Sequence, residues 1–295
     1  MESKLKNYAH LHFIVFIWGF TAVLGKLITI DALPLVWYRM GIAAVLILIF
    51  IALKRDSFKV AKRTFLTLAM AGAALALHWV TFFAAIKVSN VSIALATMST
   101  GAFFTALLEP FWYGRKMIWY ELFFGLIVIL GLLLIFKVEM HYGLGMLLAL
   151  LSAFMGVIFT LFNGKLVIVE KPSLIAFYEL SIGALLVSVF LGFQGEFSKE
   201  FFQLSQSDWV FIGILASFCT AYAFIGGVQV MKYISPYTVI LTVNLEPVYG
   251  IILAYLILGD SEQMNPMFYV GALIILATVI ANGIIKNQGK LKKES

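Results

Sequence analysis

The chain has 295 residues, of which 62% are hydrophobic and only 12% are charged, and its formal net charge is +6. Soluble domains carry about 25% charged residues, so this composition excludes a protein with an ordinary water-exposed surface. The basic residues stand between apolar segments instead of forming one patch, so the positive charge does not predict nucleic-acid binding. The single cysteine, Cys219, excludes an intrachain disulfide and a multi-thiolate metal site.

Apolar segments long enough to cross a membrane follow one another along the whole chain. About 20 helical residues, at 1.5 Å per residue, cover the roughly 30 Å of hydrocarbon in a bilayer. The first segment continues to Ile30 without a small-residue cleavage site, which favours a retained span over a signal peptide. Polar and turn-forming residues separate the segments. In chain order, we expect ten spans at about residues 9–30, 33–53, 64–87, 90–113, 118–137, 143–164, 172–194, 208–231, 235–258 and 266–286.

The positions of Lys and Arg predict which side of the membrane each connection faces. Cytoplasmic connections carry an excess of basic residues. With both termini inside, the outer segments hold only Lys26, Lys87, Lys137 and Lys199, and every other basic residue outside the spans is on the inner side. We therefore expect a multi-pass protein of the inner (plasma) membrane with two cytoplasmic termini.

The sequence also repeats itself weakly. Gly25-Lys26 precedes an aromatic-Tyr-Arg segment at 37–39, and Gly164-Lys165 precedes an aromatic-Tyr-Glu segment at 177–179. A repeat of five spans is odd in number, so its second copy enters the membrane from the opposite side, as in many secondary transporters. The alternative is that apolar helices look alike by chance. We expect an all-α integral membrane protein of ten helices in two inverted five-helix repeats, residues 1–140 and 141–295.

The chain resembles the EamA family of the drug/metabolite transporter superfamily over residues 10–286. The resemblance includes Trp18-Gly19, the aromatic segments described above, and Leu245-Glu246-Pro247-Val248 followed by Leu-Gly-Asp at 258–260. It implies export or exchange of small metabolites, often amino acids or related compounds, by alternating access. The small multidrug resistance branch of this superfamily uses a glutamate in its first span, and this chain has none there.

Ionisable residues inside the apolar segments are candidates for function because each costs about 2.5–3.5 kcal/mol at the bilayer centre. Arg39 and Glu179 occupy mirror positions in opposite leaflets, so we expect Glu179 to neutralise Lys165 rather than Arg39. These three residues, with Glu246, form the predicted coupling or charge network. Anchoring between helices is the alternative for Arg39 and Glu179.

Glu246 lies in the middle of the ninth predicted span, and Pro247 frees a backbone carbonyl one turn earlier. With Asn244 beside it, this kink is suited to binding a proton or a substrate amine. The alternatives are a buried ion pair with Arg39 and a role in helix packing. His78-Trp79 and Phe82 in the third span combine a titratable ring with aromatic surface. His78 is alternatively an interhelix hydrogen-bond donor.

Further polar and aromatic residues complete the predicted substrate lining, although Ser and Thr also join transmembrane helices. They are Trp18, Ser99, Thr100, Asn163, Thr220 and Tyr222. Near the cytoplasmic ends of their spans, Glu109 and Glu121 are expected to pair with basic residues.

The sequence contains no nucleotide-binding loop, no metal-spaced His/Cys cluster and no catalytic triad, so we expect neither an enzyme nor a cofactor. The predicted partners are the lipid bilayer, a small-molecule substrate and a proton as coupling ion, in a monomer or a homodimer. The alternative functions are a passive channel or a membrane scaffold and, less in keeping with the sequence, a membrane-embedded enzyme.

Overall fold

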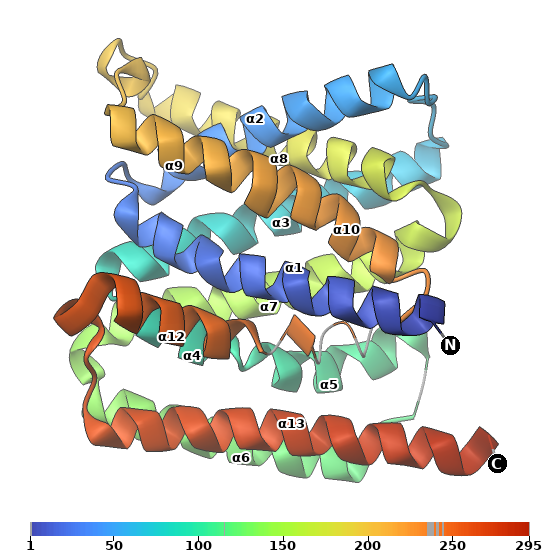
Figure 1. Ribbon diagram of the computed structural model, residues 1–295, viewed down its shortest axis with the longest axis vertical. Coiled ribbons are helices and arrows are strands. Elements are labelled where there is room, and N and C mark those ends of the chain that lie inside the picture. Colours follow the sequence, from blue (N-terminus) through green and yellow to red (C-terminus); the bar gives the residue numbers. More distant parts are fainter. Residues whose placement is uncertain (1, 115, 235–238, 240–241, 244, 295) are drawn as a thin grey trace.

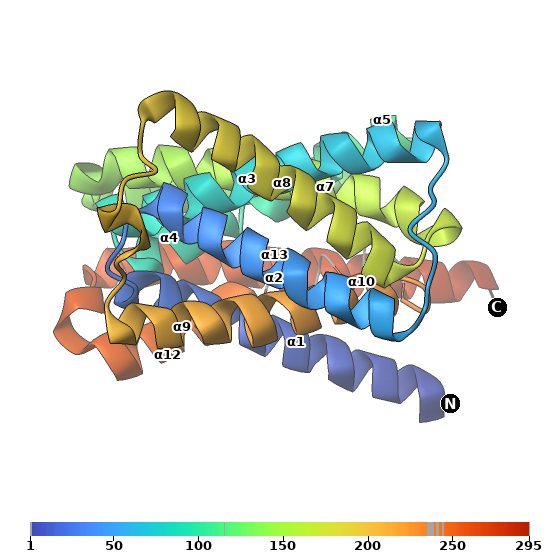
Figure 2. The same cartoon turned by 90° about the horizontal axis from the view of Figure 1, so that it is seen from above.

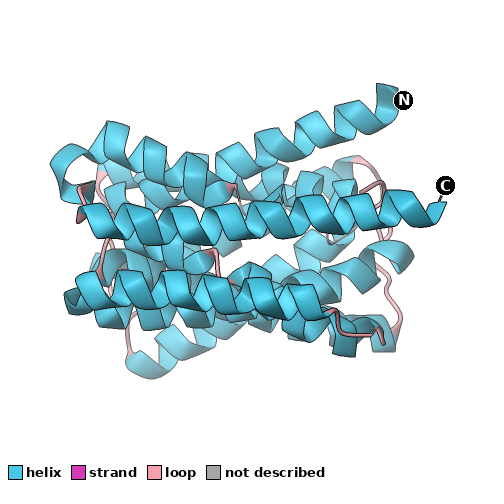
Figure 3. Ribbon diagram, turned by 90° about the horizontal axis from the view of Figure 1, so that it is seen from below, coloured by secondary structure: helices cyan, strands magenta, loops and turns pink. Residues whose placement is uncertain are grey.

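The computed structural model describes residues 2–114, 116–234, 239, 242–243 and 245–294. Every regular element in these residues is a helix (Figure 3). Helical structure satisfies each backbone polar group within its own segment, as a bilayer requires. Both termini lie at the same end of the bundle (Figures 1 and 3).

The first part of the chain forms six α-helices and one 3₁₀ turn. They are α1 (Glu2–Leu27), α2 (Ala32–Leu53), α3 (Lys62–Val88), α4 (Val91–Met98), α5 (Gly101–Tyr113), α6 (Trp119–Val138) and η1 (Met140–Tyr142).

The second part also contains both long and interrupted helices. It contains α7 (Gly143–Val169), α8 (Pro172–Gln194), η2 (Glu200–Phe202), α9 (Gln206–Ala216), the π-helical η3 (Ser217–Tyr222), α10 (Ala223–Val230), α12 (Glu246–Leu258), η4 (Gly259–Glu262) and α13 (Pro266–Glu294).

Seven helical segments in the described part of the chain are long and apolar enough to cross a membrane. Two more, Phe123–Val138 and Pro266–Thr278, are apolar but shorter, and the ninth predicted span is described as a helix only from Glu246. A multi-pass membrane protein is therefore supported, and the exact count of ten spans stays a prediction. Spans four and eight differ from the expected single α-helices, because Ser99-Thr100 separates α4 from α5 and a π-helical turn separates α9 from α10.

The helices pack in pairs that bring distant parts of the sequence together. Helix α3 lies between α7 and α8, α2 crosses α8, and α1 packs on α12 (Figures 1 and 2). Helices α6 and α13 pack on each other along one edge of the bundle (Figure 1). A glycine permits the close approach of α3 to α8, because a Cβ at Gly72 would lie 2.8 Å from the backbone oxygen of Glu179.

The end of the bundle away from the termini is closed by buried polar contacts. We call it the distal end; it is formed by residues 28–31, 88–91, 139–142, 195–205 and 259–265. The carboxylate of Glu262 accepts hydrogen bonds from the backbone N–H groups of Val91 (3.1 Å) and Ser92 (2.9 Å) and from the Ser92 hydroxyl (2.8 Å). These N–H groups open α4 and have no acceptor within their own helix. Glu262 thus joins the first and second parts of the chain.

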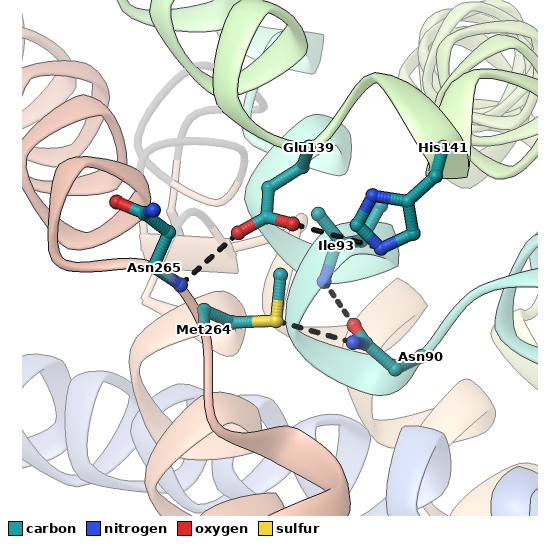
Figure 4. Close-up of polar contacts among 6 residues, drawn as sticks. All are labelled: Asn90, Ile93, Glu139, His141, Met264 and Asn265. Carbon is teal, nitrogen blue, oxygen red and sulfur yellow. Dashed lines mark hydrogen bonds and ion pairs between the residues drawn. The ribbon is translucent and has the colours of Figure 1, made fainter.

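A second group of contacts lies beside this one (Figure 4). Asn90 accepts from the backbone N–H of Ile93 at 2.8 Å and donates to the sulfur of Met264 at 3.2 Å. The carboxylate of Glu139 accepts from the backbone N–H of Asn265 at 3.0 Å, and its second oxygen lies 3.8 Å from His141 Nε2. The distal ends of α4, α6 and α13 are therefore held together.

Candidate functional site

A cavity of about 170 Å³ lies between the helices in the middle of the bundle. Its aromatic wall comprises Trp18, Trp79, Phe82, Phe159 and Phe224. Its polar side chains are those of Thr21, Arg39, His78, Thr160, Asn163 and Glu246. Ligand pockets combine an apolar wall with a few convergent polar groups in this way.

Arg39, on α2, supplies the positive charge of the cavity. Its side chain is only 2% exposed, and its Nε donates to the hydroxyl of Thr220 at 2.7 Å. Its Cζ lies 3.6 Å from the ring centroid of Trp79, within the range of a cation–π contact. Thr220 belongs to the π-helical turn and donates to the carbonyl of Leu215, so its oxygen is free to accept from Arg39. The guanidinium is thereby held in one orientation.

Glu246, the first residue of α12, lines the same cavity. Among the described residues, no ion pair within 4 Å joins Glu246 to Arg39, so the structure does not show the ion pair considered from the sequence. The cavity therefore presents a guanidinium and a carboxyl group that are not joined by a direct ion pair. The amide of Asn244, predicted to assist Glu246, lies outside the described residues.

His78 is fixed between α3 and α7 by reciprocal contacts with Ser152. The Ser152 hydroxyl donates to the carbonyl of His78 at 2.8 Å, and Nδ1 of His78 lies 2.9 Å from the carbonyl of Ser152. Since the hydroxyl hydrogen is used, Nδ1 is assigned as the donor and Nε2 keeps a lone pair in the neutral ring. The imidazole stacks on Phe82 with ring centroids 6.2 Å apart.

Asn163 and Glu179 form a fully buried pair between α7 and α8. Asn163 Nδ2 donates to Glu179 Oε1 at 3.0 Å and to the carbonyl of Phe159 at 3.2 Å. Asn163 lines the cavity, whereas Glu179 lies behind it. The structure differs from the expected pairing of Glu179 with Lys165, because the Lys165 ammonium lies 5.1 Å from the ring centroid of Trp112 instead.

Four predicted lining residues lie outside the cavity, and one of them is Thr220, which bonds to Arg39. The hydroxyls of Ser99 and Thr100 bond to the carbonyls of Leu95 and Thr97 in their own chain segment. The side chain of Tyr222 is 42% exposed, and its hydroxyl lies 3.0 Å from His10 Nε2 on the outside of the bundle. The helices are apolar on most sides, so the sequence could not show which helix face meets the cavity. The predicted residues that do line the cavity are Trp18, Arg39, His78, Trp79, Phe82, Asn163 and Glu246.

The sequence reasoning missed Thr21, Ser152 and Thr160. Thr160 and Asn163 are three residues apart, which places them on one face of α7, and this spacing was the available signal. Of the two glutamates expected to pair near the cytoplasmic ends, the side chain of Glu121 lies outside the described part of the structure, and Glu109 makes an electrostatic or polar contact.

A family model described as the EamA-like transporter family matches residues 9–137 and 143–283. This chain belongs to the EamA-like transporter family. This match confirms the prediction that the protein belongs to the drug/metabolite transporter superfamily. The EamA-like chain is therefore a membrane transporter of this type. No curated protein matches its sequence.

The EamA-like chain also resembles a solved structure, titled only as a crystal structure of a protein. The likeness covers 94% of this chain and 96% of the other, with a TM-score of 0.68 and 13% sequence identity. At this identity the likeness shows the fold and says nothing of substrate.

Proposed function

We propose that the protein is a secondary transporter that exports or exchanges small amphoteric metabolites, such as amino acids, by alternating access. Family membership supports the transporter class, and the cavity supports the substrate class. The observation that carries the proposal is that Arg39 and Glu246 line one cavity without pairing among the described residues. A substrate with a carboxylate and an ammonium group complements both charges.

The size and wall of the cavity narrow the substrate further. About 170 Å³ is smaller than the roughly 300–1,000 Å³ typical of pockets for drug-sized ligands. The aromatic side chains of Trp18, Trp79 and Phe82 offer apolar surface to the part of the substrate between or beyond its charges. A small metabolite with an apolar side chain fits these features better than a bulky drug or a sugar.

The transport cycle follows from the proposed inverted repeat. Residues 1–140 and 141–295 would be two five-helix halves that rock about the cavity. In the proposed orientation both termini are cytoplasmic, the distal end faces outside, and the contacts of Glu262 and Glu139 hold the outer end closed. Opening that end requires those hydrogen bonds to exchange for water, and closing the opposite end completes the cycle.

Counterflow in proteoliposomes tests the proposal. Vesicles preloaded with pooled amino acids, nucleobases or sugars receive a trace of the labelled pool outside, and saturable accumulation from the amino-acid pool is expected. Arg39→Gln and Glu246→Gln should each abolish it, whereas Lys199→Gln and Glu196→Gln, in the exposed 195–205 segment, should not. Non-saturable flux without counterflow would instead indicate a channel, and unchanged counterflow in the two cavity variants would refute the assignment of the site.

A further inference from the structure

The Asn163–Glu179 pair leaves two buried oxygen atoms without a partner. Neither Asn163 Oδ1 nor Glu179 Oε2 has a hydrogen bond to any described residue. Both side chains are 0% exposed. The orientation of the amide is fixed, because Nδ2 already donates to two acceptors, Glu179 Oε1 and the carbonyl of Phe159. An unpaired buried oxygen costs about 1–3 kcal/mol, so two of them in one pair require an explanation.

The charged groups of the surrounding helices do not compensate a carboxylate at Glu179. On α2, Arg39 is bound to Thr220; on α3, His78 is bound to Ser152. On α7, the Lys165 ammonium lies against Trp112, and the Lys171 ammonium before α8 bonds to Asp56. Helix α10 has no ionisable residue, and Tyr178 beside Glu179 donates to the carbonyl of Phe58.

One proton on Glu179 would supply a hydrogen-bond donor for the two unpaired oxygen atoms. An isolated buried carboxylate is costly in an apolar interior, whereas a carboxylic acid carries one O–H donor. A proton on Glu179 Oε2 can donate to Asn163 Oδ1, on the same amide whose Nδ2 already bonds to Oε1. An acid and an amide can pair through two such hydrogen bonds, which would satisfy both unpaired oxygens at once.

We propose that Glu179 and Asn163 form a proton-binding site whose occupancy is coupled to substrate through the Asn163 amide. This inference rests on the proposed transport function and extends it to the energy source. Asn163 lines the cavity, so a substrate ammonium that bonds to Asn163 Oδ1 competes with the Glu179 O–H for that oxygen and places a positive charge nearby, which favours the ionised carboxylate. Substrate binding thus favours transfer of the proton from Oε2 to cavity water, and proton binding favours substrate release. This is the logic of proton–substrate antiport.

Infrared difference spectroscopy of the protein in lipid tests the site without any substrate. The wild type minus Glu179→Gln spectrum should show the carbonyl band of a protonated carboxylic acid, and the band should shift on deuteration. Asn163→Leu should shift the band by removing the O–H acceptor, and Glu196→Gln, an exposed glutamate in the connection after α8, should leave it unchanged. A carboxylate band in place of the acid band, or one that requires Na⁺ in the buffer, would overturn the proposal.

Transport then tests the coupling, with the labelled pool that shows counterflow as the probe. A pH gradient with the acidic side inside the vesicles should drive accumulation of substrate by the wild type. In Glu179→Gln, the ratio of internal to external substrate should fall to one, while counterflow at equal pH is kept. Gradient-driven accumulation that survives Glu179→Gln would refute the proton site and leave the transporter assignment intact. Absence of counterflow in the wild type would refute the proposed function, while the infrared result would still decide whether Glu179 binds a proton.

Discussion

Replacing Glu262 with alanine should destabilise the protein by loosening the distal end. The carboxylate is 1% exposed and accepts three hydrogen bonds, two from the first backbone N–H groups of α4 and one from the Ser92 hydroxyl. Each hydrogen bond to a charged group contributes about 1.5–3 kcal/mol. Water at the end of the bundle replaces part of this, and losing an N-terminal cap costs about 0.5–2 kcal/mol. We expect a net loss of about 2–4 kcal/mol.

Unfolding in mixed micelles of increasing SDS content measures this change. Glu262→Gln keeps a carbonyl acceptor but loses the charge that favours a helix N-terminus, so it should lie between alanine and wild type. Glu196→Ala, on the exposed 195–205 segment, is the matched control and should stay within about 0.5 kcal/mol of wild type. If Glu262→Ala is as stable as this control, the three hydrogen bonds contribute nothing and the reasoning is refuted.

Three other substitutions separate the cavity from its surroundings. Arg39→Lys keeps the positive charge but loses the hydrogen bond to Thr220 and the planar contact with Trp79. The KM for transport should therefore rise about tenfold, equivalent to 1.4 kcal/mol. An unchanged KM would contradict this prediction. Gly72→Ala should cost about 1–3 kcal/mol in the SDS assay because its Cβ meets the Glu179 backbone, whereas Gly192→Ala, with no atom within 4 Å, should not destabilise. Tyr222→Phe should leave counterflow unchanged, since its hydroxyl contacts only His10 among the described residues; a transport defect would place Tyr222 in the pathway.

Hydropathy and charge predicted much of the membrane architecture and several of the residues that line the candidate site. Arg39, His78 and Glu246 could be identified because ionisable groups are expensive inside apolar segments. The partner of Glu179 could not be predicted from charge alone. Asn163 and Lys165 are two residues apart on α7, which turns their side chains to different faces, so only Asn163 meets Glu179.

Other features depend on contacts that no single segment of sequence specifies. The π-helical turn at Ser217–Tyr222 presents Thr220 to Arg39, but its residues differ little from those of a regular apolar helix. The sequence predicted that Ser99, Thr100, Thr220 and Tyr222 line the cavity, and the structure places them outside it. Helices that are apolar on most sides give no periodic signal to show which face meets the cavity.

The pairing of α6 with α13 has a consequence for how motion of the protein can be observed. Among the cavity-lining residues in the described part of the chain, none belongs to either helix. The two helices approach each other closely at Gly131 and Gly271. A cycle that reshapes the cavity therefore does not require these two helices to separate. A pair of spectroscopic labels placed across the α6–α13 contact is suited to serve as a constant-distance reference, against which a label near the cavity reports each change of state.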